Sequence, residues 1–404
     1  MNVLVLNCGS SSIKYQLLSI SGDKEDVSAK GIVERVGLSE GVLVHKAAGK
    51  DNFQLNRPFP GHVDGINAIL EALTNEQHGV ISDIHQIDAV GHRVAHGGEY
   101  FSGSVLIDEQ TKINIEKCSE LAPLHNPANL KGIVSMEKLL PQTPQVAVFD
   151  TSFHQTIPEK AYLYAVPYEY YQDYKIRRYG FHGTSHKFVA EKACNLAGLD
   201  INNSKIVTCH MGNGVSVTAI KNGKSIDTSM GFTPLEGSVM GTRSGDIDAG
   251  IITFLQEKKN LTASEINNFL NKDCGLSGIS GISSDMRDLW IQYEKGNQRA
   301  KLAIDIFIYR IAKYIGAYAV AMNGLDMVVY TGGIGENDWN VRLGISEYLS
   351  FLGAEIDKTA NDHLRTDKVI SALESKIKLV LAETNEELVI AIDTVKIITK
   401  NNKK

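Results

Sequence analysis

The chain has 404 residues, of which 43% are hydrophobic, and it carries a formal net charge of -6 at pH 7. This length can bury a large core and exceeds the usual limit for one domain, so two domains are expected. The modest charge and the lack of a long basic run predict no nucleic-acid partner. The five cysteines are scattered without a Cys-x-x-Cys pair, and no apolar run of about 18 residues occurs, so we expect a cytoplasmic protein without a disulfide framework, a zinc knuckle or a membrane partner.

The amino terminus is predicted to form a hairpin around a polar loop. Residues 3–6 are four apolar residues in unbroken sequence, which is typical of a strand covered on both faces. Residues 7–12 then supply one glycine and three serines, and Lys14 lies on the returning strand. Glycine lets backbone N–H groups approach a ligand, and the serine and lysine side chains add donors. The loop therefore suits a phosphate, although on these residues alone an ordinary serine-rich turn is an equal alternative.

Strands and helices alternate through the rest of the first part. Asn126 stands before Pro127, which predicts a helix start with Asn126 as the N-cap. Residues 151–179 are rich in Tyr and Pro with weak periodicity, as expected where the chain crosses to a second domain. Strands are predicted at residues 30–36, 41–45, 87–94 and 145–149, and a helix at residues 63–77.

A second hairpin repeats the first. Residues 205–219 again read as an apolar strand, a glycine-rich polar loop and a returning strand, with His210 at the place of Asn7. Residues 87–91 are echoed at residues 325–329, and each of these strands is predicted to enter a glycine-rich loop, at residues 97–98 and at residues 332–337. Two echoes in the same order indicate a duplicated domain whose halves face each other across a ligand-binding cleft. Further helices are predicted from residue 185 and at residues 298–323, 337–352 and 386–399.

Three familiar motifs are rejected. Gly223-Lys224-Ser225 resembles the end of a P-loop, but Thr218 stands where the first glycine belongs. His92 and His96 have the spacing of a zinc protease helix, but the catalytic Glu is replaced by Arg93. No G-x-G-x-x-G run follows a predicted strand, so a Rossmann dinucleotide site is not expected.

Four titratable side chains stand beside glycine-rich loops, and each has a structural alternative. Arg93 follows a strand and suits a carboxylate or phosphate ligand, or else a structural salt bridge. Asp150 directly follows a strand, where it either reaches a ligand or caps a turn. His182 lies between two glycines, where a structural histidine is the commoner outcome. Arg243 lies in a polar, glycine-rich run and either pairs with an anion or belongs to a solvated loop.

Six motifs spread over nearly the whole chain are more specific than any single loop. They are residues 7–14 (NCGSSSIK), 91–93 (GHR), 179–186 (YGFHGTSH), 210–214 (HMGNG), 240–246 (MGTRSGD) and 384–387 (TNEE). In this order they resemble the signatures of the acetate kinase family, within the acetate and sugar kinase, heat-shock ATPase and actin superfamily. The resemblance implies an α/β fold of two duplicated actin-like (ribonuclease H-like) domains, with the active site in the cleft between them. The implied N-terminal domain is residues 1–150, completed by the C-terminal helix 386–404, and residues 151–385 form a second domain with most of the nucleotide site.

The reaction implied by the resemblance is reversible, Mg-dependent transfer of the γ-phosphoryl group of ATP to acetate, giving acetyl phosphate and ADP. A carboxylate is already a nucleophile, so direct in-line transfer needs no strong base and depends on alignment and charge neutralisation. By the resemblance, Arg93 would hold the carboxylate. Arg243 and His182 would stabilise the equatorial oxygens of the phosphoryl group in flight, and His125 would assist them. Asp150 would order Arg93 or help to hold the metal.

The resemblance also implies a metal site and a nucleotide site. Asn7 and Glu386 would be linked to Mg²⁺, or to Mn²⁺ in its place, with several waters kept on the ion. The residues implied to bind ATP or ADP are Lys14, His210, Met211, Gly212, Asn213, Gly214, Asp285, Met286, Arg287, Gly333, Ile334, Gly335, Glu336 and Asn337.

One departure from the family pattern concerns the pocket for the methyl group of acetate. Acetate enzymes more often carry valine at the position of Ala95, and the smaller alanine leaves room for another carbon. A propionate kinase is therefore the near alternative, and a non-metabolic ATPase of the superfamily is a distant one. A homodimer is implied by resemblance only. The implied pocket residues are Ala95, Leu124, Phe181 and Pro234.

Overall fold

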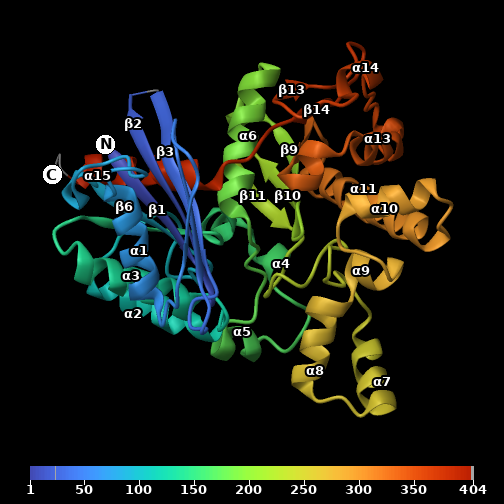
Figure 1. Cartoon of the computed structure of the whole chain (residues 1–404). Coiled ribbons are helices and arrows are strands. Elements are labelled where there is room, and N and C mark those ends of the chain that lie inside the picture. Colours follow the sequence, from blue (N-terminus) through green and yellow to red (C-terminus); the bar gives the residue numbers. More distant parts are fainter. Residues whose placement is uncertain (23, 402–404) are drawn as a thin grey trace. The chain divides into compact units, whose positions relative to one another are not determined.

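The computed structural model describes residues 1–22 and 24–401. The chain divides into two compact units (Figure 1). Unit 1 consists of Met1–Phe153 and Asn385–Lys404, and unit 2 of His154–Thr384. Each unit contains one mixed sheet with helices on it. Within the described part of the chain, no helix combines the length and the apolar character needed to span a bilayer.

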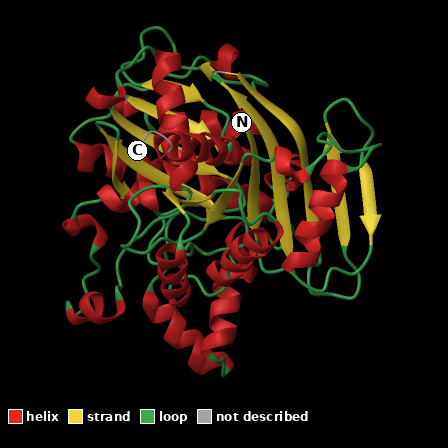
Figure 2. Cartoon of the chain, turned by 90° about the vertical axis from the view of Figure 1, so that its left-hand side faces the viewer, coloured by secondary structure: helices red, strands yellow, loops and turns green. Residues whose placement is uncertain are grey.

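The sheet of unit 1 has the strand order β5-β4-β3-β2-β1-β6-β8-β7. Its central strand β1 runs antiparallel to β2 and parallel to β6, and β6 runs parallel to β8. Figure 2 shows these strands as long yellow ribbons beside the helices of the same unit. The strands are β1 (Asn2–Cys8), β2 (Ser12–Ser21), β3 (Lys24–Glu34), β4 (Val42–Ala47), β5 (Phe53–Asn56), β6 (Ala89–Val94), β7 (Val105–Leu106) and β8 (Gln145–Phe149).

Strand β1 is buried on both faces, as its unbroken apolar run predicted. Leu4 and Leu6 belong to a core that also contains residues of α1 and α3. Val3 and Val5 point the other way, into a core shared with α15. Burying each such side chain stabilises the fold by about 1.5–3 kcal/mol. The helices of unit 1 are α1 (His62–Thr74), α2 (Glu109–Lys117), α3 (Asn126–Leu139) and α15 (Glu386–Asn401), with 3₁₀ turns at Ile84–Gln86, Cys118–Glu120 and Ser152–Thr156, the last of which runs into unit 2.

The sheet of unit 2 repeats the topology of unit 1. Its order is β11-β10-β9-β12-β14-β13, and β9 is antiparallel to β10 and parallel to β12, which is parallel to β14. This matches β3-β2-β1-β6-β8-β7 strand for strand, so the predicted duplication of an α/β domain is confirmed. The strands are β9 (Lys205–Met211), β10 (Val215–Lys221), β11 (Lys224–Thr228), β12 (Met327–Thr331), β13 (Lys368–Val369) and β14 (Lys378–Leu381).

Two long helices cover β9, and the two faces of this strand differ in chemistry. Val207, Cys209 and Met211 lie in an apolar core with α11 (Gln298–Met322). Thr208 and His210, on the alternate face, hydrogen-bond to side chains of α6 (Gly183–Ala197). The shorter helices are α4 (Glu159–Tyr162), α5 (Glu169–Tyr174), α7 (Ala249–Lys259), α8 (Ala263–Asn268), α9 (Gly275–Ser280), α10 (Met286–Glu294), α12 (Gly332–Asn337), α13 (Trp339–Tyr348) and α14 (Lys358–Asn361), with a π-helical turn at Phe269–Asp273 and 3₁₀ turns at Ile201–Asn203 and Ser350–Leu352.

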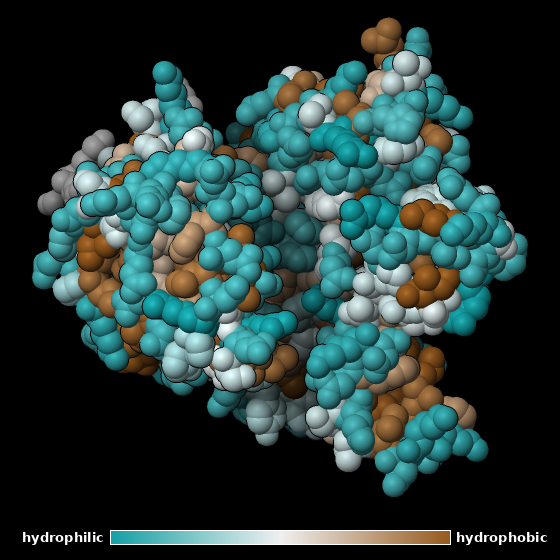
Figure 3. All heavy atoms as spheres, viewed as in Figure 1, coloured by the Kyte–Doolittle hydropathy of each residue, from teal (hydrophilic) through white to brown (hydrophobic). Residues whose placement is uncertain are grey.

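Helix α7 contrasts with the buried helices, because none of its side chains is buried. Ile251 and Phe254 are exposed. Figure 3 shows a brown, hydrophobic area low on the right, where Figure 1 places α7 and α8. This part of unit 2 carries apolar residues that the fold of the single chain does not cover.

Two local expectations were wrong. The N-cap of α3 is His125, and Asn126 is instead the first helical residue. The Asn126 side chain is engaged by a tertiary contact, since it bonds to the backbone of His96. Residues 332–337 were expected to be a glycine-rich loop but form the short helix α12, whose first residue Gly332 has a positive φ of 77°.

Candidate active site

The predicted ligand residue Arg93 lies in unit 1 at the carboxyl end of β6 and is held by an ion pair. Its Nε donates to Asp150 Oδ1 at 3.1 Å and its Nη2 to Asp150 Oδ2 at 2.5 Å. Asp150 directly follows β8, and its side chain is 3% exposed. The Arg93 side chain keeps 24% exposure. A guanidinium that is held along its Nε–Nη2 edge by a carboxylate has a fixed orientation, and its other N–H groups remain available to a ligand.

Two further predicted residues gather at Arg93. Arg93 Nη1 lies 3.4 Å from Asn7 Oδ1, near the end of β1. Arg93 Nε lies 3.8 Å from Glu386 Oε2, at the start of α15. Three adjacent strand ends and one helix start therefore bring Asn7, Arg93, Asp150 and Glu386 into one cluster, although they are distant in sequence.

The charges of this cluster set the protonation of Asp150. Burial raises the pKa of Asp150 to about 6, with Arg93 opposing the rise and Glu386 adding to it. The same carboxylates raise the pKa of Arg93, so its guanidinium stays charged. At neutral pH Asp150 and Arg93 are both charged, and each is the ion-pair partner of the other.

The oxygen donors of the cluster suit a hard divalent cation. Asp150 directs both carboxylate oxygens at Arg93, which leaves the Asn7 amide oxygen and the Glu386 carboxylate as donors. The described residues contain no set of three His, Cys, Asp or Glu side chains arranged for a metal ion. One or two protein oxygens with several waters are what Mg²⁺ ordinarily takes.

The first turn of α3 holds the loop after β6. Asn129 Oδ1 accepts from Ala95 N at 3.0 Å, and Asn129 Nδ2 donates to Cys8 O at 2.7 Å. Asn126 pairs with the backbone of His96 in the same way, with both of its amide atoms. The two asparagines thus tie the ends of β1 and β6 to one helix turn. Sequence reasoning took Asn126 for a cap and did not single out Asn129, although their i, i+3 spacing puts them on one helix face.

The other predicted residues of unit 1 lie around this cluster. Ala95 is buried, and Leu124 and His125 are exposed at the start of α3. Lys14 is exposed on β2 and is the direct strand partner of Asn7. The serine loop between them is closed by Gly9 N donating to Ser12 O at 2.8 Å, and His62 Nε2 lies 2.8 Å from Gly9 O.

In unit 2, His182 occupies a strained turn at the N-cap of α6. Its φ of 56° is in the left-handed region, which a non-glycine residue rarely adopts. Gly180 before it has a φ of 75°, and a Cβ there would lie 2.3 Å from Thr228 Cγ2. The imidazole stacks on His210 with ring centroids 4.2 Å apart. Backbone strain held in place by its surroundings is a frequent property of functional sites.

Arg243 lies next to His182 across the glycine loop between β9 and β10. A Cβ on Gly214 would lie 3.4 Å from Arg243 Nη1 and 3.6 Å from His182 Nε2. Arg243 Nη1 donates to Pro234 O at 3.1 Å. Burial lowers the pKa of Arg243, and no ion pair to it is found among the described residues to oppose the effect. A partly desolvated guanidinium beside a histidine and a glycine loop is suited to an anion.

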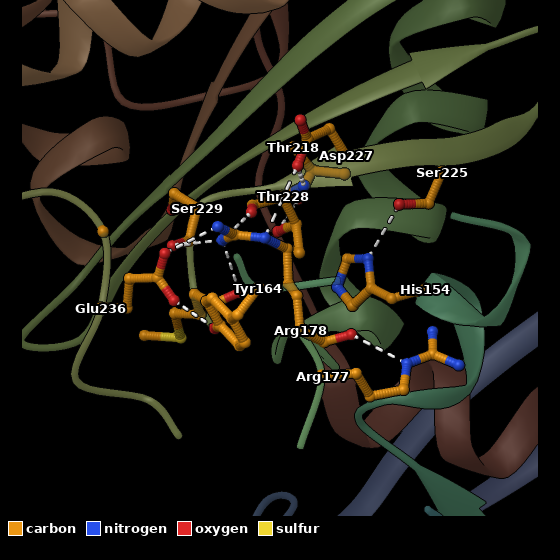
Figure 4. A network of polar contacts seen from close by, with 12 residues as sticks. His154, Tyr164, Arg177, Arg178, Thr218, Ser225, Asp227, Thr228, Ser229 and Glu236 are labelled. Carbon is orange, nitrogen blue, oxygen red and sulfur yellow. Dashed lines mark hydrogen bonds and ion pairs between the residues drawn. The ribbon is translucent and has the colours of Figure 1, made fainter. Parts of the chain in front are cut away.

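A partly buried network fixes the loop that carries Pro234 and Arg243 (Figure 4). Arg178 Nη2 donates to Glu236 Oε1 at 2.6 Å, and its Nη1 donates to the carbonyl oxygens of Thr228 and Ser229 at 2.7 and 3.1 Å. The Tyr164 hydroxyl also donates to Glu236. Sequence reasoning missed Arg178 and Glu236, and no motif or spacing marked them.

The predicted nucleotide residues of unit 2 fall into two groups. His210 lies near the end of β9, next to the loop of residues 212–214. In this loop Gly212 N donates to Gly214 O at 3.0 Å, and the backbone oxygen of Asn213 accepts from Gly241 N at 3.0 Å. Helix α12 contains Gly333, Ile334, Gly335 and Asn337, and Glu336 turns its carboxylate back to Gly332 N at 3.0 Å.

Two predicted adenosine or phosphate contacts have inward-facing side chains. Met211 and Met286 are buried in the apolar core of unit 2, so only their backbone atoms are available to a ligand. Asp285 caps α10, accepting from Arg287 N at 2.9 Å, and its carboxylate also pairs with the exposed Arg287 guanidinium.

Comparison with known proteins shows which family these residues belong to. The family model described as the Acetokinase family matches residues 2–392. The chain belongs to the acetokinase family. It is therefore a member of a family of phosphoryl-transferring enzymes, as the six sequence motifs predicted.

Similar proteins cover nearly the whole chain. An acetate kinase of Agathobacter rectalis is 55% identical over 98% of this chain and 100% of its own length. An acetate kinase of Carboxydothermus hydrogenoformans is 55% identical over 98% of this chain and 99% of its own. Among solved structures, Porphyromonas gingivalis acetate kinase matches with a TM-score of 0.96 at 48% identity, covering 98% of this chain and 99% of that one. A propionate kinase from Francisella tularensis matches with a TM-score of 0.89 at 42% identity, with the same coverage.

Proposed function

We propose that this protein is an acetate kinase, which transfers the γ-phosphoryl group of ATP to acetate and forms acetyl phosphate and ADP. The observation that carries the proposal is Arg93, whose guanidinium is fixed by Asp150 on one edge and partly exposed on the rest. A planar fork of this kind suits a carboxylate acceptor. Family membership supports the same reaction.

In the proposed reaction, Arg93 binds and orients the acetate carboxylate, whose oxygen attacks the γ-phosphorus directly. The O–P bond to acetate forms as the P–O bond to ADP breaks, and no proton needs to be removed from the nucleophile. Arg243 and the His182 imidazole stabilise the charge on the equatorial phosphoryl oxygens. His125 assists Arg243 and His182 at the phosphoryl group, and Asp150 keeps Arg93 in place.

We assign the metal to Asn7 and Glu386, and Mg²⁺ is the ion that their oxygen donors suit, with Mn²⁺ as the substitute. When bound, the ion would neutralise phosphate charge. The ATP phosphates would lie against residues 212–214 and Lys14, and the nucleotide against α12 and residues 285–287. In this proposal the protein is a cytoplasmic homodimer, for which family resemblance and the uncovered apolar surface of α7 are the support.

Trapping of acetyl phosphate as its hydroxamate tests the reaction directly. Purified protein with ATP, Mg²⁺, acetate and hydroxylamine should give acetohydroxamate in proportion to ADP. ADP release without acetohydroxamate, at any acetate concentration, would show an ATPase of another kind and refute the proposal. Light scattering of the same sample measures the oligomeric state.

Propionate is the second candidate acceptor, and Ala95 is the observation that favours it. This residue stands in the proposed methyl pocket, and one structural relative is a propionate kinase. One methylene is worth about 1–3 kcal/mol in such a pocket, so relaxed rather than switched preference is expected. Ala95→Val should lower kcat/KM for propionate roughly 10-fold relative to acetate. A wild-type enzyme that prefers propionate clearly would reverse our assignment.

A further inference from the structure

The interior between α6 and the sheet of unit 2 is unusually polar at one place. His186, Thr208 and Ser216 are each fully buried there. Thr208 Oγ1 lies 2.7 Å from His186 Nδ1, and Ser216 Oγ lies 2.7 Å from His186 Nε2. Ser216 Oγ also lies 2.8 Å from His182 Nδ1. These four side chains form an unbroken hydrogen-bond chain that ends at the proposed catalytic histidine.

His186 carries only one ring proton. Burial and the neighbouring histidines His154 and His210 lower its pKa well below the usual value. A neutral imidazole has one N–H donor and one acceptor nitrogen. The ring therefore donates toward one of Thr208 and Ser216 and accepts from the other, so the chain has only two possible directions.

Counting the donors selects one direction. If Thr208 donates to His186 Nδ1, then His186 Nε2–H donates to Ser216 Oγ, and the Ser216 hydroxyl donates to His182 Nδ1. Each hydrogen that links Thr208, His186, Ser216 and His182 Nδ1 then has an acceptor. In the reverse direction the Thr208 hydroxyl would have to donate elsewhere, and the described residues place no second hydrogen-bond partner at Thr208 Oγ1. A buried donor without an acceptor costs about 1–3 kcal/mol.

We propose that Thr208, His186 and Ser216 fix His182 as the tautomer with Nδ1 accepting and the proton on Nε2. His182 Nε2 is 3.6 Å from the point that a Cβ on Gly214 would occupy, and Arg243 Nη1 is 3.4 Å from the same point. His182 Nε2 and Arg243 Nη1 thus lie on the same side of the Gly214 backbone. Thr208, His186 and Ser216 are positioning residues in this account, and of the four side chains in the hydrogen-bond chain only His182 touches the phosphoryl group.

The role given to this tautomer rests on the proposed function, but the tautomer itself can be measured without substrate. A fixed Nε2–H supplies a hydrogen bond to a phosphoryl oxygen at once, without rotation of the ring or choice between tautomers, and preorganised donors of this kind are the effective ones. Stacking on His210 and the left-handed backbone at His182 hold the ring plane. The hydroxyl chain decides which nitrogen carries the proton.

Nitrogen-15 NMR of the full chain, labelled in its histidine rings, reads the tautomer without substrate. The His182 signal is identified by its loss in His182→Gln. We expect a protonated Nε2 and an unprotonated Nδ1 at His182, and a protonated Nε2 at His186. A proton on Nδ1 of His182 in the wild-type protein overturns the inference, whatever the hydroxamate assay shows.

Kinetics of matched variants then tests the purpose. Ser216→Ala should lower kcat roughly 10-fold with little change in the KM for acetate, which is less than the 10²–10³ lost when a donor is removed outright. Ser216→Thr keeps the hydroxyl and should restore turnover. Thr218→Val is the control, because Thr218 lies on the same strand and, among the described residues, its hydroxyl bonds only to Thr228 of the neighbouring β11, at 2.8 Å. Equal losses in Ser216→Ala and Thr218→Val, or wild-type turnover in Ser216→Ala, would refute a positioning role.

Discussion

Replacing Asp150 by Asn should separate the position of Arg93 from its charge. The carboxylate accepts from Nε and Nη2 of Arg93 at 3.1 and 2.5 Å and is almost fully buried. Asn keeps the shape of the side chain. Its amide N–H₂ group would however face the guanidinium of Arg93, and both groups are hydrogen-bond donors. Breaking a buried pair by changing one partner costs about 3–5 kcal/mol. Because Asn7 at 3.4 Å and Glu386 at 3.8 Å remain beside Arg93, we expect the lower end, about 3 kcal/mol.

The kinetic effect of Asp150→Asn follows from a guanidinium that is no longer aligned. We expect kcat/KM for acetate to fall roughly 10²-fold or more, with a much smaller change in the KM for ATP, since Asp150 acts through the acetate-binding Arg93. The coupled hydroxamate assay gives both constants, and urea unfolding gives the stability. Arg57→Ala, which breaks an exposed pair with Glu71, is the control and should change neither. A folded Asp150→Asn enzyme with the wild-type acetate kcat/KM would refute the reasoning.

The pH dependence of the same pair gives an independent reading. The pKa of Asp150 is raised to about 6 in the folded protein against 3.8 in the unfolded chain. Activity should fall below about pH 6 as protonation releases Arg93. The native state binds the extra proton, so this group's contribution to stability should fall as pH rises from about 4 to 6. Both effects should be absent in Asp150→Asn, and an unchanged acid limb of kcat/KM would contradict the assignment of that limb to Asp150.

Three more substitutions test unit 2. Arg243→Ala should reduce kcat by roughly 10²-fold or more, since it removes the positive charge that stabilises the phosphoryl group. Near-normal turnover of the folded variant would refute that role. Arg178→Lys keeps the charge but loses the fork that joins Glu236 to two carbonyl oxygens, so we expect roughly 10-fold lower kcat/KM and a lower melting temperature, and an unchanged enzyme would show that the loop needs no such support. Gly180→Ala should destabilise unit 2 by more than about 1 kcal/mol, because φ is 75° and the new Cβ would clash with Thr228 and His154. Gly223→Ala has a similar φ of 74°, but its Cβ would make only ordinary van der Waals contacts and should cost less; equal costs would show that the clash is unimportant.

The sequence by itself determined the duplicated fold. The unbroken apolar run at residues 3–6 became β1, because such a run needs cover on both faces, and its predicted echo at residues 205–219 became β9 and β10. Arg93, Asp150, His182 and Arg243 stood out because each follows or joins glycine-rich loops at strand ends. The helices α7, α8 and α9 gave no clear periodic signal, since α7 has no buried face and α8 and α9 are one or two turns long.

Only the tertiary structure decided how those residues are held. Arg178 and Glu236 are far apart in sequence. They meet because the loop after β11 brings Glu236 to the Arg178 guanidinium, which also bonds to the end of β11. The same is true of Asn126 and Asn129, whose partners lie on β1 and after β6. The chain from Thr208 through His186 and Ser216 to His182 joins two strands to one helix, and alternation along a strand does not reveal which hydroxyl meets which ring. Local pattern sets which face of an element is buried, whereas the pairing of side chains across elements depends on packing that no local window contains.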